Sequence, residues 1–138
     1  MLRNVSLRRA LLVSTALLFA AIDLLHKTFT PTEIHHARSQ ATTLVMAGVI
    51  AALVVLVPRI PSKAAALGAG IACGGALGNL VSLLAWSQGV PDPLVLVGPT
   101  HALAFNLADL FALAGDALLV SAAVLYGLRH REQLRERI

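Results

Sequence analysis

The sequence predicts an all-α integral membrane protein with four transmembrane helices and both termini in the cytoplasm. Hydrophobic residues make up 57% of its 138 residues and charged residues only 13%, whereas roughly 25% are charged in an ordinary soluble domain. Four apolar stretches approach the roughly 20 residues that a helix needs to cross the hydrocarbon core. Runs of this length without strand-like alternation pair their backbone groups in lipid only as helices. We expect one four-helix domain over residues 1–138.

The first expected helix covers residues 10–29 and follows Arg3, Arg8 and Arg9. Basic residues before an apolar core are also typical of a cleaved signal peptide, which is the alternative for this segment. We favour a retained helix, because polar residues near its end would find partners on the three later spans.

The second expected helix covers residues 41–57, the third 64–86 and the fourth 103–128, with short polar or proline-containing connections between them. Glycines recur in the third helix at four-residue spacing, at Gly70, Gly74 and Gly78. Such a strip lets a neighbouring backbone approach closely, which is a common basis of helix association in lipid. We therefore expect these glycines to bring polar side chains of other helices together.

The charge distribution predicts the orientation. Nine lysine and arginine residues fall on one side of the spans, and Lys27 and Arg38 fall on the other. Because cytoplasmic loops carry the excess of basic residues, both termini are expected in the cytoplasm. The net charge of +4 comes from short clusters beside apolar runs, with only 4% aromatic residues, so it does not indicate nucleic-acid binding. The single cysteine excludes a disulfide or a cysteine-based metal site within one chain.

Polar side chains inside a membrane span are costly and therefore suggest function. At about 1.5 Å per residue, Asp23, Asn79 and Asp109 are each expected roughly 10 Å below the outer end of their helix. Ser82 and Asn106 are expected one turn higher. Helices that pack these faces together would hold a polar layer that opens towards the outer water.

Each of these residues also has a structural interpretation. Asp23 and Lys27, four residues apart, could form a local ion pair whose lysine extends outward to water. Asn79 and Ser82 could form hydrogen bonds that join helices. Asp116 lies further along the fourth span, where we expect a protonated side chain bonded to a neighbouring helix.

Asp92 lies between two prolines in a connection that is otherwise apolar from Gly89 to Gly98. This pattern suggests a segment that dips into the membrane interface, although an ordinary turn aspartate is the simpler interpretation. Asp92 and Asp109 would then converge at the outer mouth of the bundle. Two carboxyl groups held close share one proton and can serve as base and acid around one attacking water.

Two motifs resemble those of signal peptidase II, the lipoprotein signal peptidase. They are Gly74-Gly75-Ala76-Leu77-Gly78-Asn79-Leu80 and, on the next expected helix, Phe105-Asn106-Leu107-Ala108-Asp109. The segment from Asp23 to Lys27 also resembles the Asp-x-x-x-Lys pattern that ends the first helix of that family.

The resemblance implies a four-helix aspartyl protease of the bacterial cytoplasmic membrane, without a metal or organic cofactor. Such an enzyme cuts the signal peptide of prolipoproteins just before a diacylglyceryl-modified cysteine, so its partners are the prolipoprotein and membrane lipids, not nucleic acid. The resemblance further implies that Asp109 stands at the family's second catalytic aspartate, with Asp92 as the only acid available for the first. The residues expected to bind substrate are Asn79, Asn106, Gly78, Asp23, Lys27 and Ser82.

The chain also departs from the family pattern. Ser82 and Leu83 stand where the family usually has an Asp-Arg pair, and the connection over residues 34–40 lacks the family's Asn-x-Gly-Ala-Ala-Phe stretch. The alternative is therefore a non-catalytic relative that binds a lipidated peptide or a membrane partner. A third and weaker hypothesis is a small transporter with Asp109 and Asp116 as a proton relay.

Four histidines are expected on the outer side, at His26, His35, His36 and His101. Adjacent histidines in a helix point about 100° apart, so they share an ion only through a turn or an extended segment. We interpret them as surface histidines and keep metal binding as a weaker alternative.

Overall fold

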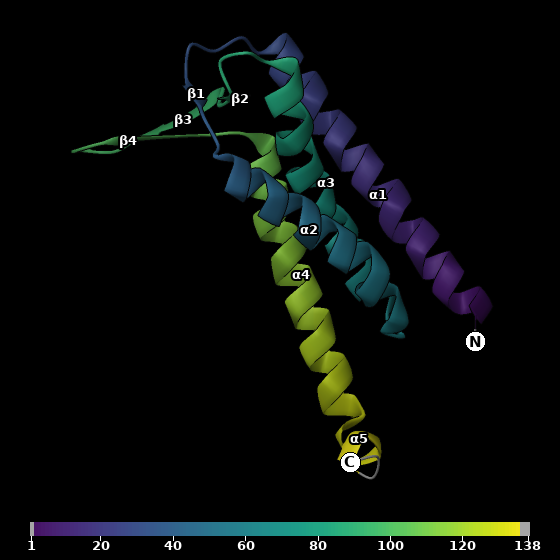
Figure 1. Cartoon of the computed structure of the whole chain (residues 1–138). Coiled ribbons are helices and arrows are strands. Elements are labelled where there is room, and N and C mark those ends of the chain that lie inside the picture. The colour runs from purple at the N-terminus through teal and green to yellow at the C-terminus, as the bar shows by residue number, and fades with distance from the viewer. Residues whose placement is uncertain (1, 136–138) are drawn as a thin grey trace.

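The computed structural model describes residues 2–135, and four long helices dominate it (Figure 1). These are α1 (Leu2–Phe29), α2 (Gln40–Leu56), α3 (Lys63–Ala85) and α4 (Leu107–Arg129). Each contains a segment long and apolar enough to cross a membrane, which confirms the predicted mostly helical fold with four candidate membrane spans. The shorter elements are η1 (Val57–Arg59), α5 (Arg131–Arg135), β1 (His35–His36), β2 (Val90–Pro91), β3 (Leu94–Val97) and β4 (Ala102–Phe105).

Side-chain caps fix where three of the long helices begin. Ser39 accepts a hydrogen bond from the backbone N–H of Thr42 at the start of α2, and Ser62 accepts one from Ala65 at the start of α3, both at 3.1 Å. Asn106 caps α4 in the same way. A serine or asparagine in this position pairs a backbone N–H that the helix itself leaves without a partner.

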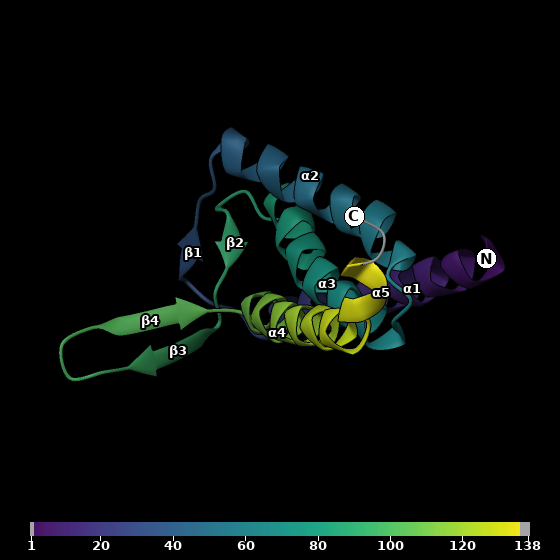
Figure 2. The same ribbon diagram turned by 90° about the horizontal axis from the view of Figure 1, so that it is seen from below.

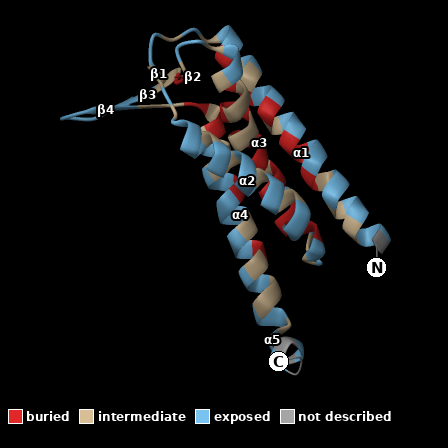
Figure 3. Ribbon diagram, viewed as in Figure 1, coloured by how far each residue is buried: buried red, intermediate tan, exposed pale blue. Residues whose placement is uncertain are grey.

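Helix α3 is the centre of the bundle and packs against α1 on one face and α4 on another (Figure 2). Burial is concentrated on α3 and on the facing side of α1 (Figure 3). The expected close approach at glycines is present: a Cβ atom added to Gly74 would lie 2.6 Å from the Phe19 Cβ atom of α1. Helix α2 lies outside this core, and all of its residues are at least partly exposed.

The fourth membrane helix begins later than predicted, at Leu107 instead of residue 103. Residues 102–105 form β4, which pairs with β3 in an antiparallel hairpin. The sequence Leu-Val-Leu-Val followed by Gly98 and Pro99 forms a strand and a turn, since β-branched residues and a Gly-Pro pair both favour that structure. The other three helices match their predicted spans to within one residue, except that α1 already begins at Leu2.

A second short pairing joins two connections that are far apart in the sequence. Strands β1 and β2 are antiparallel, with His35 opposite Pro91 and His36 opposite Val90. The backbone N–H of Asp92 extends this pairing by donating to the Ile34 carbonyl at 3.0 Å. The connection after α1 is thereby held against the connection after α3.

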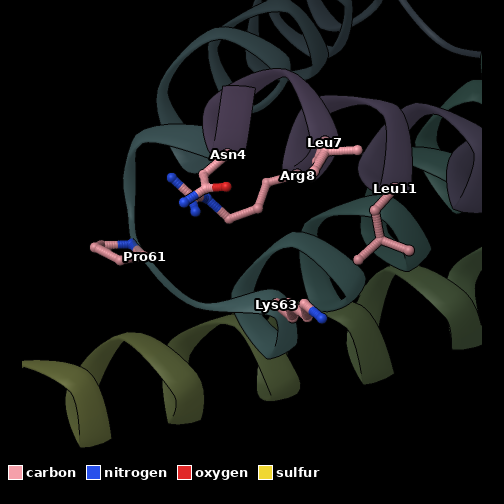
Figure 4. Close-up of a pocket in the computed structure, with 6 residues that line it drawn as sticks. All are labelled: Asn4, Leu7, Arg8, Leu11, Pro61 and Lys63. Carbon is pink, nitrogen blue, oxygen red and sulfur yellow. The ribbon is translucent and has the colours of Figure 1, made fainter. Parts of the chain in front are cut away.

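The opposite end of the bundle is basic. A cavity of about 290 Å³ lies there, between the start of α1 and the start of α3 (Figure 4). It is lined by Asn4, Leu7, Arg8, Leu11, Pro61 and Lys63. No acidic side chain lines this cavity.

Candidate active site

A buried lysine organises the polar residues of α1 and α3. The Lys27 Nζ atom donates hydrogen bonds to Asp23 Oδ2 at 2.6 Å, to Asn79 Oδ1 at 2.9 Å and to Ser82 Oγ at 3.1 Å. These three acceptors match the three N–H donors of an ammonium group. The predicted ion pair with Asp23 is present, but the expectation that the lysine extends outward to water is wrong. Its side chain is 0% exposed, because the helices supply the acceptors that water would otherwise provide.

The Asp23 carboxylate joins three helices. Its Oδ1 atom accepts a hydrogen bond of 2.8 Å from the backbone N–H of Ala108, in the first turn of α4. On the other side it packs against Gly78 of α3, where an added Cβ atom would lie 2.5 Å from Asp23 Oδ2. Glycine at this position therefore leaves room for the carboxylate between α1 and α3.

Asp109 lies in the first turn of α4 and is bonded on both carboxylate oxygens. Oδ1 accepts a hydrogen bond from Asn79 Nδ2 at 3.0 Å, and Oδ2 accepts one from the backbone N–H of Asn106 at 3.2 Å. The second bond is half of a capping box, and the helix N-terminus further favours a negative charge there. The side chain is 35% exposed, whereas the Asp23 side chain is fully buried.

The predicted depth of Asp109 inside its helix is wrong, although the polar layer itself is present. Asp109 reaches Asn79 because α4 starts deep in the bundle, and not because it lies two turns below the start of a longer helix. Asn106 is correspondingly the N-cap residue of α4, where a turn of helix was expected.

Asp92 is buried, at 1% exposure, beside the same asparagine. Asn106 Nδ2 donates to Asp92 Oδ1 at 2.7 Å, while Asn106 Oδ1 accepts from the backbone N–H of Asp109 at 3.1 Å. One side chain thus contacts both acidic residues. Asp92 is held by the pairing of β1 with β2, and the segment after it forms a hairpin strand.

Two residues at this end did not enter the predicted site. His36 Nδ1 contacts Asp92 Oδ2, and Arg38 Nη2 lies 3.9 Å from Asp109 Oδ1. Both belong to the connection after α1, where the sequence departs from the family pattern. That departure was the available signal, but the pairing of β1 with β2, which brings His36 to Asp92, is not visible in sequence spacing.

The four histidines do not come together around an ion. His36 contacts Asp92, while His101 lies at the hairpin tip and contacts Thr100. Within residues 2–135 the structure has no group of three or more side chains that could hold a metal ion. Asp116 is exposed on α4, so the expectation that it is bonded against a neighbouring helix is wrong.

An apolar groove lies beside the acids, between the start of α2 and the end of α3. It has a volume of about 630 Å³. It is lined by Arg38, Gln40, Thr43, Leu44, Leu80, Leu83 and Leu84. Arg38 therefore contacts both this groove and Asp109.

Comparison with known proteins agrees with the motifs. A model of the family described as "Signal peptidase (SPase) II" matches residues 28–125, which is most of the chain. A lipoprotein signal peptidase from Streptomyces coelicolor (strain ATCC BAA-471 / A3(2) / M145) is 33% identical over 87 residues. That match covers 59% of this chain and 43% of the relative, so the chain matches less than half of the relative's length. No solved structure matches. The chain belongs to the signal peptidase II family.

Proposed function

We propose that this protein is a membrane aspartic endopeptidase that cleaves the signal peptide of lipid-modified prolipoproteins, with Asp92 and Asp109 as its catalytic pair. The observation that carries the proposal is that Asn106 contacts both acidic residues, through Asp92 Oδ1 and the backbone of Asp109. One acid of the pair is buried and the other is open to water, so an attacking water and a peptide bond can approach from the side of Asp109.

The proposed reaction uses one proton shared by the two carboxyl groups. The water oxygen bonds to the peptide carbonyl carbon while the ionised carboxylate takes a proton from that water. At the same time the protonated carboxyl group donates its proton to the carbonyl oxygen. The tetrahedral intermediate then collapses. As its C–N bond breaks, the protonated carboxyl donates to the leaving nitrogen, and a hydroxyl group of the intermediate returns its proton to the other carboxylate. The pair then again holds one shared proton. No cofactor takes part in this scheme.

The other predicted site residues receive positioning roles in this proposal. Asp23, Lys27, Ser82 and Gly78 are all buried and contact one another, and Asn79 connects them to Asp109. They would hold α1, α3 and the start of α4 in a fixed arrangement, so that the distance between Asp92 and Asp109 stays constant. The groove beside Arg38 would take the apolar part of the precursor, next to the bond that is cut.

We further propose that the chain lies in the bacterial cytoplasmic membrane with both termini in the cytoplasm. The positive-inside rule supports this orientation, because nine of eleven lysine and arginine residues lie on one side of the predicted spans. The acids would then face the outer side, where the processing site of a translocated prolipoprotein emerges from the membrane.

The test is cleavage of a diacylglyceryl-modified precursor peptide by the purified protein in bilayers. We expect Asp92→Asn and Asp109→Asn each to lose at least about 100-fold in rate, because each removes an acid–base group. Asp116→Asn is the matched control, since it changes an exposed acid of the same helix outside the site, and it should cleave normally. Unchanged cleavage by folded Asp109→Asn would overturn the proposal.

The second candidate is a non-catalytic relative that binds a lipidated peptide. The groove favours it, because Leu83, standing where the family usually has arginine, lines an apolar surface suited to acyl chains. Tight binding of the intact precursor by the unmodified protein, with no product on long incubation, would support this candidate over the peptidase. The proton relay gains no support, because Asp116 is exposed and lies outside the hydrogen-bonded network around Asp109.

A further inference from the structure

The β3–β4 hairpin projects sideways from the bundle instead of covering it (Figures 1 and 2). It connects the two acids, since β3 begins two residues after Asp92 and β4 ends just before Asn106. The whole stretch from residue 93 to 108 contains no Lys, Arg, Asp or Glu. A projecting hairpin without charge needs a physical reason to stay apart from the helices.

Both faces of the hairpin are apolar. Leu96 pairs with Leu103 and Val97 pairs with Ala102, and because side chains alternate along a strand, these two pairs point to opposite faces. Leu96 is 62% exposed on one face and Val97 is 82% exposed on the other. Neither face therefore suits contact with water.

We propose that this hairpin is a membrane-interface anchor that lies among the lipids of the leaflet nearest the candidate site. Lipid can cover both apolar faces of a thin ribbon at once, whereas a protein surface packed against one face leaves the other exposed. Covering this apolar surface with lipid removes it from water, which is energetically favourable. An uncharged segment with apolar side chains on both faces is suited to the boundary between headgroups and acyl chains.

The depth of the hairpin follows from where it joins the helices. It leaves the bundle where α4 begins, below the ends of α1 and α3 in Figure 1, and the neighbouring surface of α4 is itself apolar, with Leu110 and Leu113 exposed. The free strand edges keep the hairpin out of the centre of the bilayer, because unpaired backbone groups are not tolerated in hydrocarbon. At the interface, water and lipid headgroups can pair with those edges.

The anchor sets the depth of the candidate site. Asp92 and Asn106 lie at its two ends, so lipid contacts along the hairpin would fix the acids relative to the membrane surface. This consequence rests on the proposed peptidase function. The acyl chains of a lipid-modified substrate hold the cleaved bond at one depth in the membrane, so the two acids must lie at that same depth. The location of the hairpin itself can be tested without any peptidase activity.

The test uses tryptophan fluorescence in phosphatidylcholine vesicles that carry bromine on either the upper or the lower acyl chain. In a Trp86→Phe background, which removes the only native tryptophan, single tryptophans are placed at Leu96→Trp and Val97→Trp, one on each face. Gln88→Trp is the control for a water-exposed loop. Leu113→Trp, at a position 71% exposed on α4, is the control for deep lipid.

We expect both hairpin tryptophans to emit at shorter wavelength than Gln88→Trp and to be quenched more by upper-chain than by lower-chain bromine. Leu113→Trp should show the reverse preference. Long-wavelength emission without quenching would mean that the hairpin lies in water and would overturn the proposal. Short-wavelength emission without bromine quenching, or quenching of one face only, would mean that a protein surface covers the hairpin, and would also overturn it.

A second measurement connects the anchor to processing. Leu96→Ser with Val97→Ser should slow cleavage of a precursor embedded in vesicles by about tenfold, while cleavage in detergent micelles stays unchanged. Equal loss in both media would show that the hairpin acts on the acids directly, against the anchoring role. Absence of cleavage by the unmodified protein would count against the peptidase proposal alone, because the fluorescence result is independent of it.

Discussion

Lys27 and Asp23 form an ion pair of 2.6 Å in which both side chains are 0% exposed. The pair occupies a position where α1, α3 and α4 meet, since Lys27 also donates to Asn79 and Asp23 accepts from the backbone of Ala108. Neither side chain reaches water. The pair therefore joins the helices that carry the acids, and its removal should affect stability before chemistry.

Breaking this pair from one side should be more damaging than removing it altogether. Lys27→Met leaves the Asp23 carboxylate buried without its cation, which should lower the free energy of unfolding by about 3–5 kcal/mol. Asp23→Leu combined with Lys27→Met removes both charges and should be less destabilised than Lys27→Met alone. The measurement is thermal unfolding of the purified proteins in detergent. A double variant as unstable as the sum of the two single variants would show that charge compensation is not what the pair contributes.

Asn106 has two roles that substitution can separate. Asn106→Asp keeps an oxygen to cap α4 but places a carboxylate against Asp92, whereas Asn106→Ala loses both the cap and the donor. We expect both variants to lose roughly 10- to 100-fold in kcat, since a hydrogen bond to a charged group is worth about 1.5–3 kcal/mol. Only Asn106→Ala should also lose about 1 kcal/mol of unfolding free energy through the missing cap.

Cleavage assays and unfolding curves on the same preparations separate these two effects. If Asn106→Asp retains full activity, then the contact between Asn106 and Asp92 does not matter for the chemistry, and Asn106 acts only as a helix cap.

His36 should act as a positioning residue for Asp92. An asparagine amide can replace the Nδ1 atom that contacts Asp92 Oδ2, so His36→Asn should retain most of kcat while His36→Ala loses about tenfold. KM should stay similar in both variants, because the His36 ring contacts Asp92 and does not line the groove. Steady-state kinetics distinguish this from a substrate-binding role, in which KM would rise instead.

The long elements were predictable because their signal is strong and local. Apolar runs of about 20 residues leave a chain in lipid few alternatives to helices, and the polar residues on α1, α3 and α4 do form one connected layer. The single domain, the orientation of the termini and the roles of the acids stay predictions.

The start of α4 was not predictable in the same way. Short apolar runs such as Leu94–Val97 and Ala102–Phe105 fit either a strand or the first turn of a membrane helix, and periodicity alone cannot separate these. The contact of His36 with Asp92 depends on pairing across 56 positions. The burial of Lys27 depends on acceptors from α3, which is far from Lys27 in the sequence. A local sequence pattern does not indicate such partners.

The close contact between α3 and α4 can be tested with two glycine-to-alanine substitutions on α4. They should change the free energy of unfolding in opposite directions. A Cβ atom added to Gly115 would lie 2.6 Å from the Gly68 carbonyl oxygen and 2.8 Å from the Ala72 Cα atom, so Gly115→Ala must push α4 away from α3. Gly127 has nothing within 4 Å of an added Cβ atom. Gly127→Ala should therefore gain up to about 1 kcal/mol of unfolding free energy through its better helix propensity.

Gly115→Ala should instead lose about 1–3 kcal/mol, as expected for overpacking. It should also lose activity, because Asp109 and Asn79 lie on the two helices that are forced apart and their hydrogen bond is 3.0 Å long. Unfolding in detergent and precursor cleavage measure the two effects. Stabilisation of both variants would mean that α4 can slide along α3, and the Asp109–Asn79 contact would then not depend on this crossing. Opposite signs in unfolding, together with loss of cleavage in Gly115→Ala only, would show that the helix spacing at Gly115 holds Asp109 within reach of α3.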